Sequence, residues 1–121
     1  MEDYVEAAWL PAYRRHDPRD LLAMLEVWLA NDVASAAGCC SADSEADLAQ
    51  ALGRIEAATT VVAGRHDLYF TPADCAAEAR LIPAAVYAEL DSDLGHRAGN
   101  PRQDPEAQQQ LRTLLEALWR R

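Results

Sequence analysis

The sequence contains no uncharged run near the ~20 residues that a membrane-spanning helix requires. Its acidic start, Met1-Glu2-Asp3, leads into no apolar segment of the kind that marks a secretory signal. Basic residues are few: eleven Lys and Arg stand against twenty Asp and Glu, which gives a formal net charge of −9. Because nucleic acids and anionic membranes are polyanions, we expect neither of them as a partner.

Cysteine is scarce too. Two of the three cysteines, Cys39 and Cys40, are neighbours that rarely pair with each other, and an odd number leaves one thiol over. Cys75 falls at a helix start and is expected to be a small buried residue. Without a secretory signal, these features predict a cytoplasmic protein with reduced thiols.

The pattern Gly-x-Ser-x-Gly, which presents a nucleophilic serine on a strained strand-to-helix turn, is absent. Four serines lack flanking glycines at that spacing: Ser35, Ser41, Ser44 and Ser92. A nucleophile at Cys39 or Cys40 is also disfavoured, because no predicted strand precedes Gly38. The sequence therefore offers no nucleophile of this kind.

The composition is that of one ordinary globular domain, with 121 residues, 50% of them apolar and 26% charged. Residues 1–56 read as helical and carry no strand. An apolar stripe around Tyr4 and Trp9 stops near Pro11. Asp17-Pro18 then predicts a helix start, since an Asp cap followed by Pro suits a helix N-terminus.

The helix that follows gathers large apolar residues on one broad face. We interpret them as helix core, or alternatively as the apolar face of a lid: Leu21, Leu22, Met24, Leu25, Trp28 and Leu29. Small and polar residues at 34–42 predict a loop, and residues 44–55 predict a short helix that Ser44 caps.

The pattern changes from residue 59. Residues 59–63 are β-branched or apolar and predict a strand buried on both faces. Thr71-Pro72 starts a helix that Pro83 closes, and residues 86–90 form the next strand. A strand, a crossover helix and a second strand favour parallel pairing. Because two parallel strands make a poor sheet, the first would have a bare edge open to another strand.

A long loop at 91–104 contains Gly95, Gly99 and Pro101, and Asp104-Pro105 starts the last helix. The core face of that helix is predicted to hold four leucines: Leu111, Leu114, Leu115 and Leu118.

Two side chains that can act together follow the two strands. Asp67 comes just after the first strand, and His96, which follows Gly95, comes in the loop after the second. One helix and one strand separate them, so both loops emerge at the same sheet edge, where open α/β sheets place their sites. Taken alone, Asp67 suits a turn or a cap and His96 a solvated loop. Together they are typical of the acid and general base of a catalytic triad.

A metal site is the weaker alternative. His66 with Asp91, Asp93 and His96 contains ligand-type side chains, but no H-x-x-x-H or C-x-x-C spacing is present. We expect no metal and no cofactor, and interpret His66 as a residue that orients its loop.

Residues 61–72, followed by residues 91–101, resemble the C-terminal end of α/β-hydrolases, with the homoserine O-acetyltransferase-like branch most similar. The helix at residues 21–28 also resembles the cap segment of that branch. The resemblance implies an α/β fold: a helical cap or lid segment at 1–56, then a C-terminal β-α-β-α core at 57–121 with parallel strands. It also implies Asp67 as triad acid and His96 as general base.

The implied enzyme is an acyltransferase or esterase, with a small acyl ester or an acyl-CoA-type molecule as substrate. Residues 97–101 read Arg-Ala-Gly-Asn-Pro where homoserine acetyltransferases usually carry a His-Asp-Ala-Phe-Leu type of sequence, so an ester hydrolase is as well supported.

Without a nucleophile, the chain alone is expected to be inactive. The partner would be a polypeptide that supplies the N-terminal half of the fold. The alternative is a non-enzymatic interaction module that self-associates.

Overall fold

The computed structural model describes residues 2–41, 44–100 and 102–121. The parts of the sequence predictions that involve Met1, Ala42 and Pro101 lie outside these residues. The chain divides into two compact units, Met1–Val33 and Ala34–Arg121. This division leaves untested the predicted boundary between residues 56 and 57, which stays a prediction.

The first unit opens with a helical segment that ends at Tyr13, just beyond Pro11, near which the apolar stripe was predicted to stop. α1 (Glu2–Tyr4) leads through a π-helical turn, η1 (Val5–Trp9), into α2 (Leu10–Tyr13). The N–H of Leu10 donates to the carbonyl of Val5, which is the wide spacing of a π turn. Pro11 lies at the start of α2, and the helical segment continues through it to Tyr13.

α3 (Pro18–Ala30) starts where the sequence predicts. The Asp17 side chain accepts a hydrogen bond from the N–H of Arg19 at 2.8 Å, and Pro18 occupies the first turn. The interpretation of its apolar face as core is wrong for this chain: Met24 is 68% exposed and Trp28 59%. The described residues of the first unit include no second long element that covers this face.

The second unit begins within the short helix α4 (Val33–Ala36), which is followed by α5 (Ser44–Leu52). The predicted loop at 34–42 therefore starts with a helical turn, and the predicted helix at 44–55 ends three residues early. Its end is set by Gly53, beyond which the N–H of Ile55 folds back onto the carbonyl of Leu52. Ala34, Cys39 and Ala51 form a small buried cluster between the two helices.

β1 (Thr60–Gly64) and β2 (Val86–Leu90) form a parallel two-stranded sheet, with Thr60 opposite Val86 and Gly64 opposite Leu90. The predicted parallel pairing is confirmed. The prediction that the first strand is buried on both faces is wrong, because only Ala63 in β1 is buried. Among the described residues, β2 is the only strand that pairs with β1, so the other edge of β1 is open.

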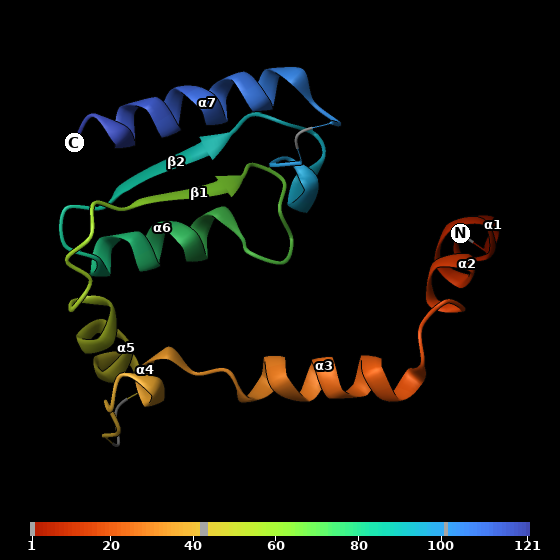
Figure 1. Ribbon diagram of the computed structural model, residues 1–121, viewed down its shortest axis with the longest axis horizontal. Helices are drawn as coiled ribbons and strands as arrows, with labels where there is room; N and C mark the ends of the chain where they lie inside the picture. Colours follow the sequence, from red (N-terminus) through yellow and green to blue (C-terminus); the bar gives the residue numbers. More distant parts are fainter. Residues whose placement is uncertain (1, 42–43, 101) are drawn as a thin grey trace. The chain divides into compact units, whose positions relative to one another are not determined.

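Two helices flank these strands. α6 (Pro72–Leu81) is the crossover between them, and α7 (Pro105–Trp119) follows β2 after the 3-10 turn η2 (Gly95–Arg97). Figure 1 shows α6 running along β1 and α7 along β2. In α7 the predicted core face is partly wrong, since Leu115 is exposed. Cys75 in α6 is half-buried rather than buried.

Two loops leave the carboxyl ends of the strands. We call residues 65–71, after β1, the acid loop, and residues 91–104, after β2, the histidine loop. Because parallel strands end at the same sheet edge, both loops lie there.

Candidate active site

Asp67 is fixed in the acid loop by the backbone around it. Its own N–H donates to the carbonyl of Gly64 at 2.9 Å, which closes a tight turn at the end of β1. Its Oδ1 accepts from the backbone N–H groups of Tyr69 at 2.8 Å and Phe70 at 3.1 Å. This is the local turn chemistry for which aspartate is favoured. Only 7% of the residue is exposed, so the carboxylate has one defined orientation.

The second carboxylate oxygen meets the histidine that the sequence analysis paired with it. Nδ1 of His96 lies 3.0 Å from Oδ2 of Asp67, across 29 residues of sequence. With the proton on Nδ1, the ring donates to Asp67, and Nε2 on the other side of the ring is left as a proton acceptor. The His96 side chain is 49% exposed, so it remains accessible to a reacting group.

The charge of this pair is settled by competing effects on Asp67. Burial alone would raise the pKa of the carboxyl group, but the hydrogen bond from His96 and those from the backbone of Tyr69 and Phe70 lower it. The balance holds the pKa of Asp67 below its ordinary value of 3.8. At neutral pH the acid is therefore an anion that attracts a positive charge on His96.

The residues just before Asp67 also reach the histidine loop. Arg65 pairs with Asp91 at 2.5 Å, and Nε2 of His66 lies 3.7 Å from Oδ1 of Asp93. Three successive side chains of the acid loop thus each face a residue of the histidine loop. His66 is consistent with its interpretation as a loop-orienting residue.

Aromatic side chains next to His96 were not predicted from the sequence. The ring centroids of Tyr69 and Phe70 lie 5.0 and 5.5 Å from that of His96, while Leu68 is 89% exposed. Three consecutive large apolar residues directly after a candidate acid are the sequence signal that could have indicated them. Asp67, His96 and Phe70 line a hollow of about 360 Å³ together with Val62, Gly64 and Cys75.

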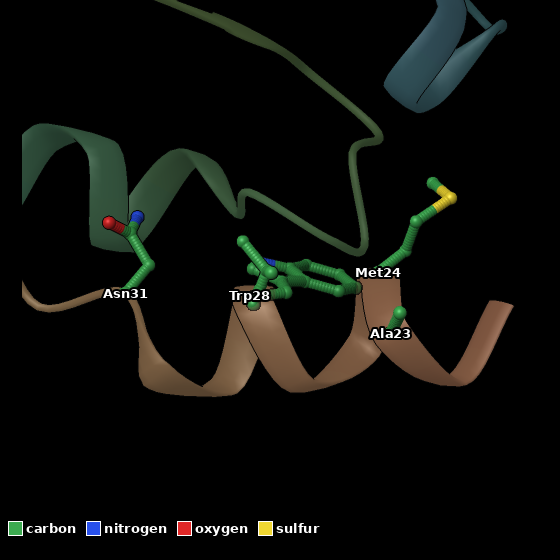
Figure 2. A pocket seen from close by; sticks show the side chains of 5 residues that line it. Ala23, Met24, Trp28 and Asn31 are labelled. Atoms are coloured by element: carbon green, nitrogen blue, oxygen red, sulfur yellow. The ribbon is translucent and has the colours of Figure 1, made fainter. Parts of the chain in front are cut away.

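A second hollow, of about 530 Å³, lies on α3 alone (Figure 2). Its lining is apolar except for one amide: Ala23, Met24, Val27, Trp28 and Asn31. None of these five side chains is an acid, a base or a nucleophile.

Within the described residues, no group of three or more His, Cys, Asp or Glu side chains is placed to hold a metal ion. The same residues include no helix long and apolar enough to cross a bilayer.

Two solved structures share this architecture over nearly the whole chain. The acetyl esterase MekB matches with a TM-score of 0.78 at 34% identity, and an acetylester hydrolase from Corynebacterium glutamicum with a TM-score of 0.75 at 31% identity. Each match covers 98% of this chain and 32% of the solved chain. The chain has the fold of the C-terminal part of an α/β-hydrolase. The predicted fold class is thereby confirmed.

Sequence comparison also finds ester hydrolases that match this chain over part of their length. The ethyl acetate hydrolase of Pseudomonas veronii is 36% identical over 96 residues, which are 79% of this chain and 26% of the relative. A probable esterase of Corynebacterium glutamicum is 36% identical over 86 residues, which are 71% of this chain and 23% of the relative. The chain spans about a quarter of the length of these relatives. No protein-family model matches it.

The names of these relatives are those of ester hydrolases. The narrower resemblance to homoserine O-acetyltransferases stays a prediction, as does the catalytic role of Asp67 and His96.

Proposed function

We propose that this chain supplies the acid and the general base of a catalytic triad to an α/β-hydrolase that cleaves a small acyl ester. The observation that carries the proposal is the hydrogen bond of 3.0 Å between Nδ1 of His96 and the buried carboxylate of Asp67. The esterase relatives support the same reaction class.

Each residue has a distinct task in this reaction. Asp67 holds the ring in the tautomer that carries its proton on Nδ1. Nε2 of His96 removes the proton of the nucleophile as it attacks the ester carbonyl, and later returns that proton to the departing alcohol. The anionic Asp67 stabilises the imidazolium formed in between.

The nucleophile must come from residues outside this sequence, since the 121 residues contain no Gly-x-Ser-x-Gly. An acid–histidine pair alone forms no acyl-enzyme, so we expect the chain by itself to be inactive. The open edge of β1 adjoins the site and is where a further parallel strand of the fold would pair. The partner is therefore a polypeptide that carries the nucleophile. The acyl donor is a small ester and the acyl acceptor is water. The alternative is an acyltransferase that takes its acyl group from an acyl-CoA-type donor.

A hybrid enzyme tests this role. The matching segment of the Pseudomonas veronii ethyl acetate hydrolase is replaced by this chain, and hydrolysis of p-nitrophenyl acetate is followed. We expect turnover that falls by at least ~100-fold in His96→Ala, because a general base contributes that much. His16→Ala removes a histidine outside the site and is the matched control.

Two results would contradict the proposal. A folded hybrid whose turnover is unchanged by His96→Ala would show that this residue is not the base. Ester hydrolysis by the pure 121-residue chain that depends on His96 would show that a nucleophile is present after all.

A specific observation favours a second candidate, a non-enzymatic module that binds another copy of itself. Large apolar side chains on α3 are exposed, including Leu29 at 79%. Sedimentation of the pure chain over a range of concentrations separates the two: association weakened by Trp28→Ser supports the module, and a monomer at all concentrations excludes it.

A further inference from the structure

The histidine loop is held at its base by a pair of side chains that the proposed reaction does not use. Oγ of Ser92 donates to Oδ2 of Asp104 at 2.5 Å, across 12 residues that include His96. The same Oγ accepts from the N–H of Leu94 at 3.2 Å. Ser92 is only 5% exposed, so its hydroxyl is fully engaged inside the protein.

Asp104 is in turn fixed by α7. Its Oδ1 accepts from the backbone N–H groups of Glu106 and Ala107, both at 3.0 Å, and so caps the helix. Ala107 is completely buried, which anchors this first turn. The N–H of Ala107, followed by the hydroxyl of Ser92, lowers the pKa of Asp104, so the acceptor is a carboxylate at neutral pH.

α7 touches the start of the loop at one more point. The side chain of Gln110 accepts from the N–H of Asp91 at 2.9 Å. The first residues of the loop and its last residue are therefore tied to the same helical turns, and His96 lies in the segment that these bonds enclose.

Such closure matters because His96 is half exposed and meets Asp67 through a single hydrogen bond. Long loops without regular secondary structure can take several conformations, so each contact that closes this one narrows the positions open to His96. A displacement of about 1 Å in a reacting group costs on the order of 100-fold in rate.

We propose that Ser92 and Asp104 are positioning residues, whose hydrogen bond closes the histidine loop and holds Nδ1 of His96 against Asp67. They touch no reacting atom and act only through the placement of His96. The role in catalysis rests on the proposed function, but the placement itself is measurable without turnover.

The test is the tautomer of His96 in the 121-residue chain, read from its ring nitrogen signals in NMR spectra at a pH above the imidazole titration. Asp67 selects the form with the proton on Nδ1, and Asp67→Asn shows the spectrum when that selection is lost. In Ser92→Ala we expect the ratio of the Nδ1-H to the Nε2-H form to fall about tenfold, as for loss of a hydrogen bond to a charged group. Ser92→Thr, which retains a hydroxyl group at this position, should keep the wild-type ratio of the two tautomers.

Ser92→Ala leaves Asp104 free to cap α7, so a change in His96 is not a consequence of a lost helix start. Thr113→Ala removes a hydroxyl that bonds within α7 and is the matched control. If Ser92→Ala does not fold, Asp104→Ser replaces it, because serine still caps a helix and is too short to reach Ser92.

In the hybrid enzyme, Ser92→Ala should lower kcat roughly 10- to 100-fold with KM unchanged, and Thr113→Ala should leave kcat as it is. A folded Ser92→Ala chain with the wild-type tautomer ratio would overturn the positioning role of Ser92 and Asp104. A folded but inactive hybrid, in which the His96 tautomer still responds to Ser92→Ala, would instead overturn the proposed function and leave the positioning role intact.

Discussion

Asp67 gathers three hydrogen bonds on one buried carboxylate: two from the backbone and one from His96. Each favours the ionised form, which is why the pKa of this group stays low in spite of burial. The orientation of the acid is thus set by backbone groups close to it in sequence, between Gly64 and Phe70, and His96 adds one hydrogen bond from a distant segment.

This carboxylate should make stability depend on pH in a defined direction. Because the pKa of Asp67 is lower in the folded than in the unfolded chain, its contribution is complete well above 3.8 and is lost as the pH falls through the folded value. We expect Asp67→Asn to reduce the loss of unfolding free energy on acidification, measured by urea titration from neutral to acidic pH. Asp93→Asn, which removes an exposed carboxylate nearby, is the control. If Asp67→Asn lost as much unfolding free energy on acidification as the wild type, Asp67 would not contribute to the pH dependence of stability.

Between elements, the end of β1 and the turn η2 fit together through two glycines. A Cβ on Gly64 would lie 2.5 Å from the carbonyl oxygen of Gly95, and a Cβ on Gly95 would lie 2.8 Å from that of His66. Gly95 also has a φ of +52°, which favours glycine. The two loops approach this closely only because neither glycine has a side chain.

Gly64→Ala should therefore force the loops apart. We expect a loss of about 1–3 kcal/mol in unfolding free energy, as for other overpacked sites, together with a weaker His96–Asp67 bond. Gly99→Ala is the matched control, because a Cβ there meets no atom within 4 Å. The unfolding free energy of both variants is measured by denaturant titration. Equal values would show that the loops move apart without loss of stability.

Across the whole molecule, burial is confined to one unit. Every buried apolar residue in the described chain lies at Ala34 or beyond, and these residues are mostly alanines. Only two buried residues, Leu52 and Leu90, are large, whereas many other large apolar side chains of the described residues are exposed, among them Trp28 and Leu29. The described residues therefore bury little large apolar surface of their own.

Removal of residues 1–33 should accordingly leave the second unit folded. We expect the 34–121 chain to lose helical circular dichroism in proportion to the missing helices, and to keep the unfolding free energy and the His96 tautomer of the full chain. Removal of α7 instead (residues 105–121) takes away buried Ala107 and should unfold the site. An unfolded 34–121 chain would show that the first unit contributes to the core.

The local sequence was sufficient to predict several features. Asp17-Pro18, Thr71-Pro72 and Asp104-Pro105 each mark a helix start, because a capping side chain acts on N–H groups within one turn. The order of strand, acid, helix, strand and histidine was enough to place Asp67 beside His96, since parallel strands end at one sheet edge.

Contacts between distant segments could not be predicted from the local sequence. The pattern of α3 shows an apolar face but not whether another element covers it, and in this chain that face is exposed. The Ser92–Asp104 bond and the contact of Gly64 with Gly95 join residues far apart in sequence, whose separation depends on how the loops pack. A helix cap or a turn forms between neighbouring residues, so the local sequence is enough to predict it. Burial and loop closure depend on the tertiary structure, because it brings together atoms that are remote in sequence.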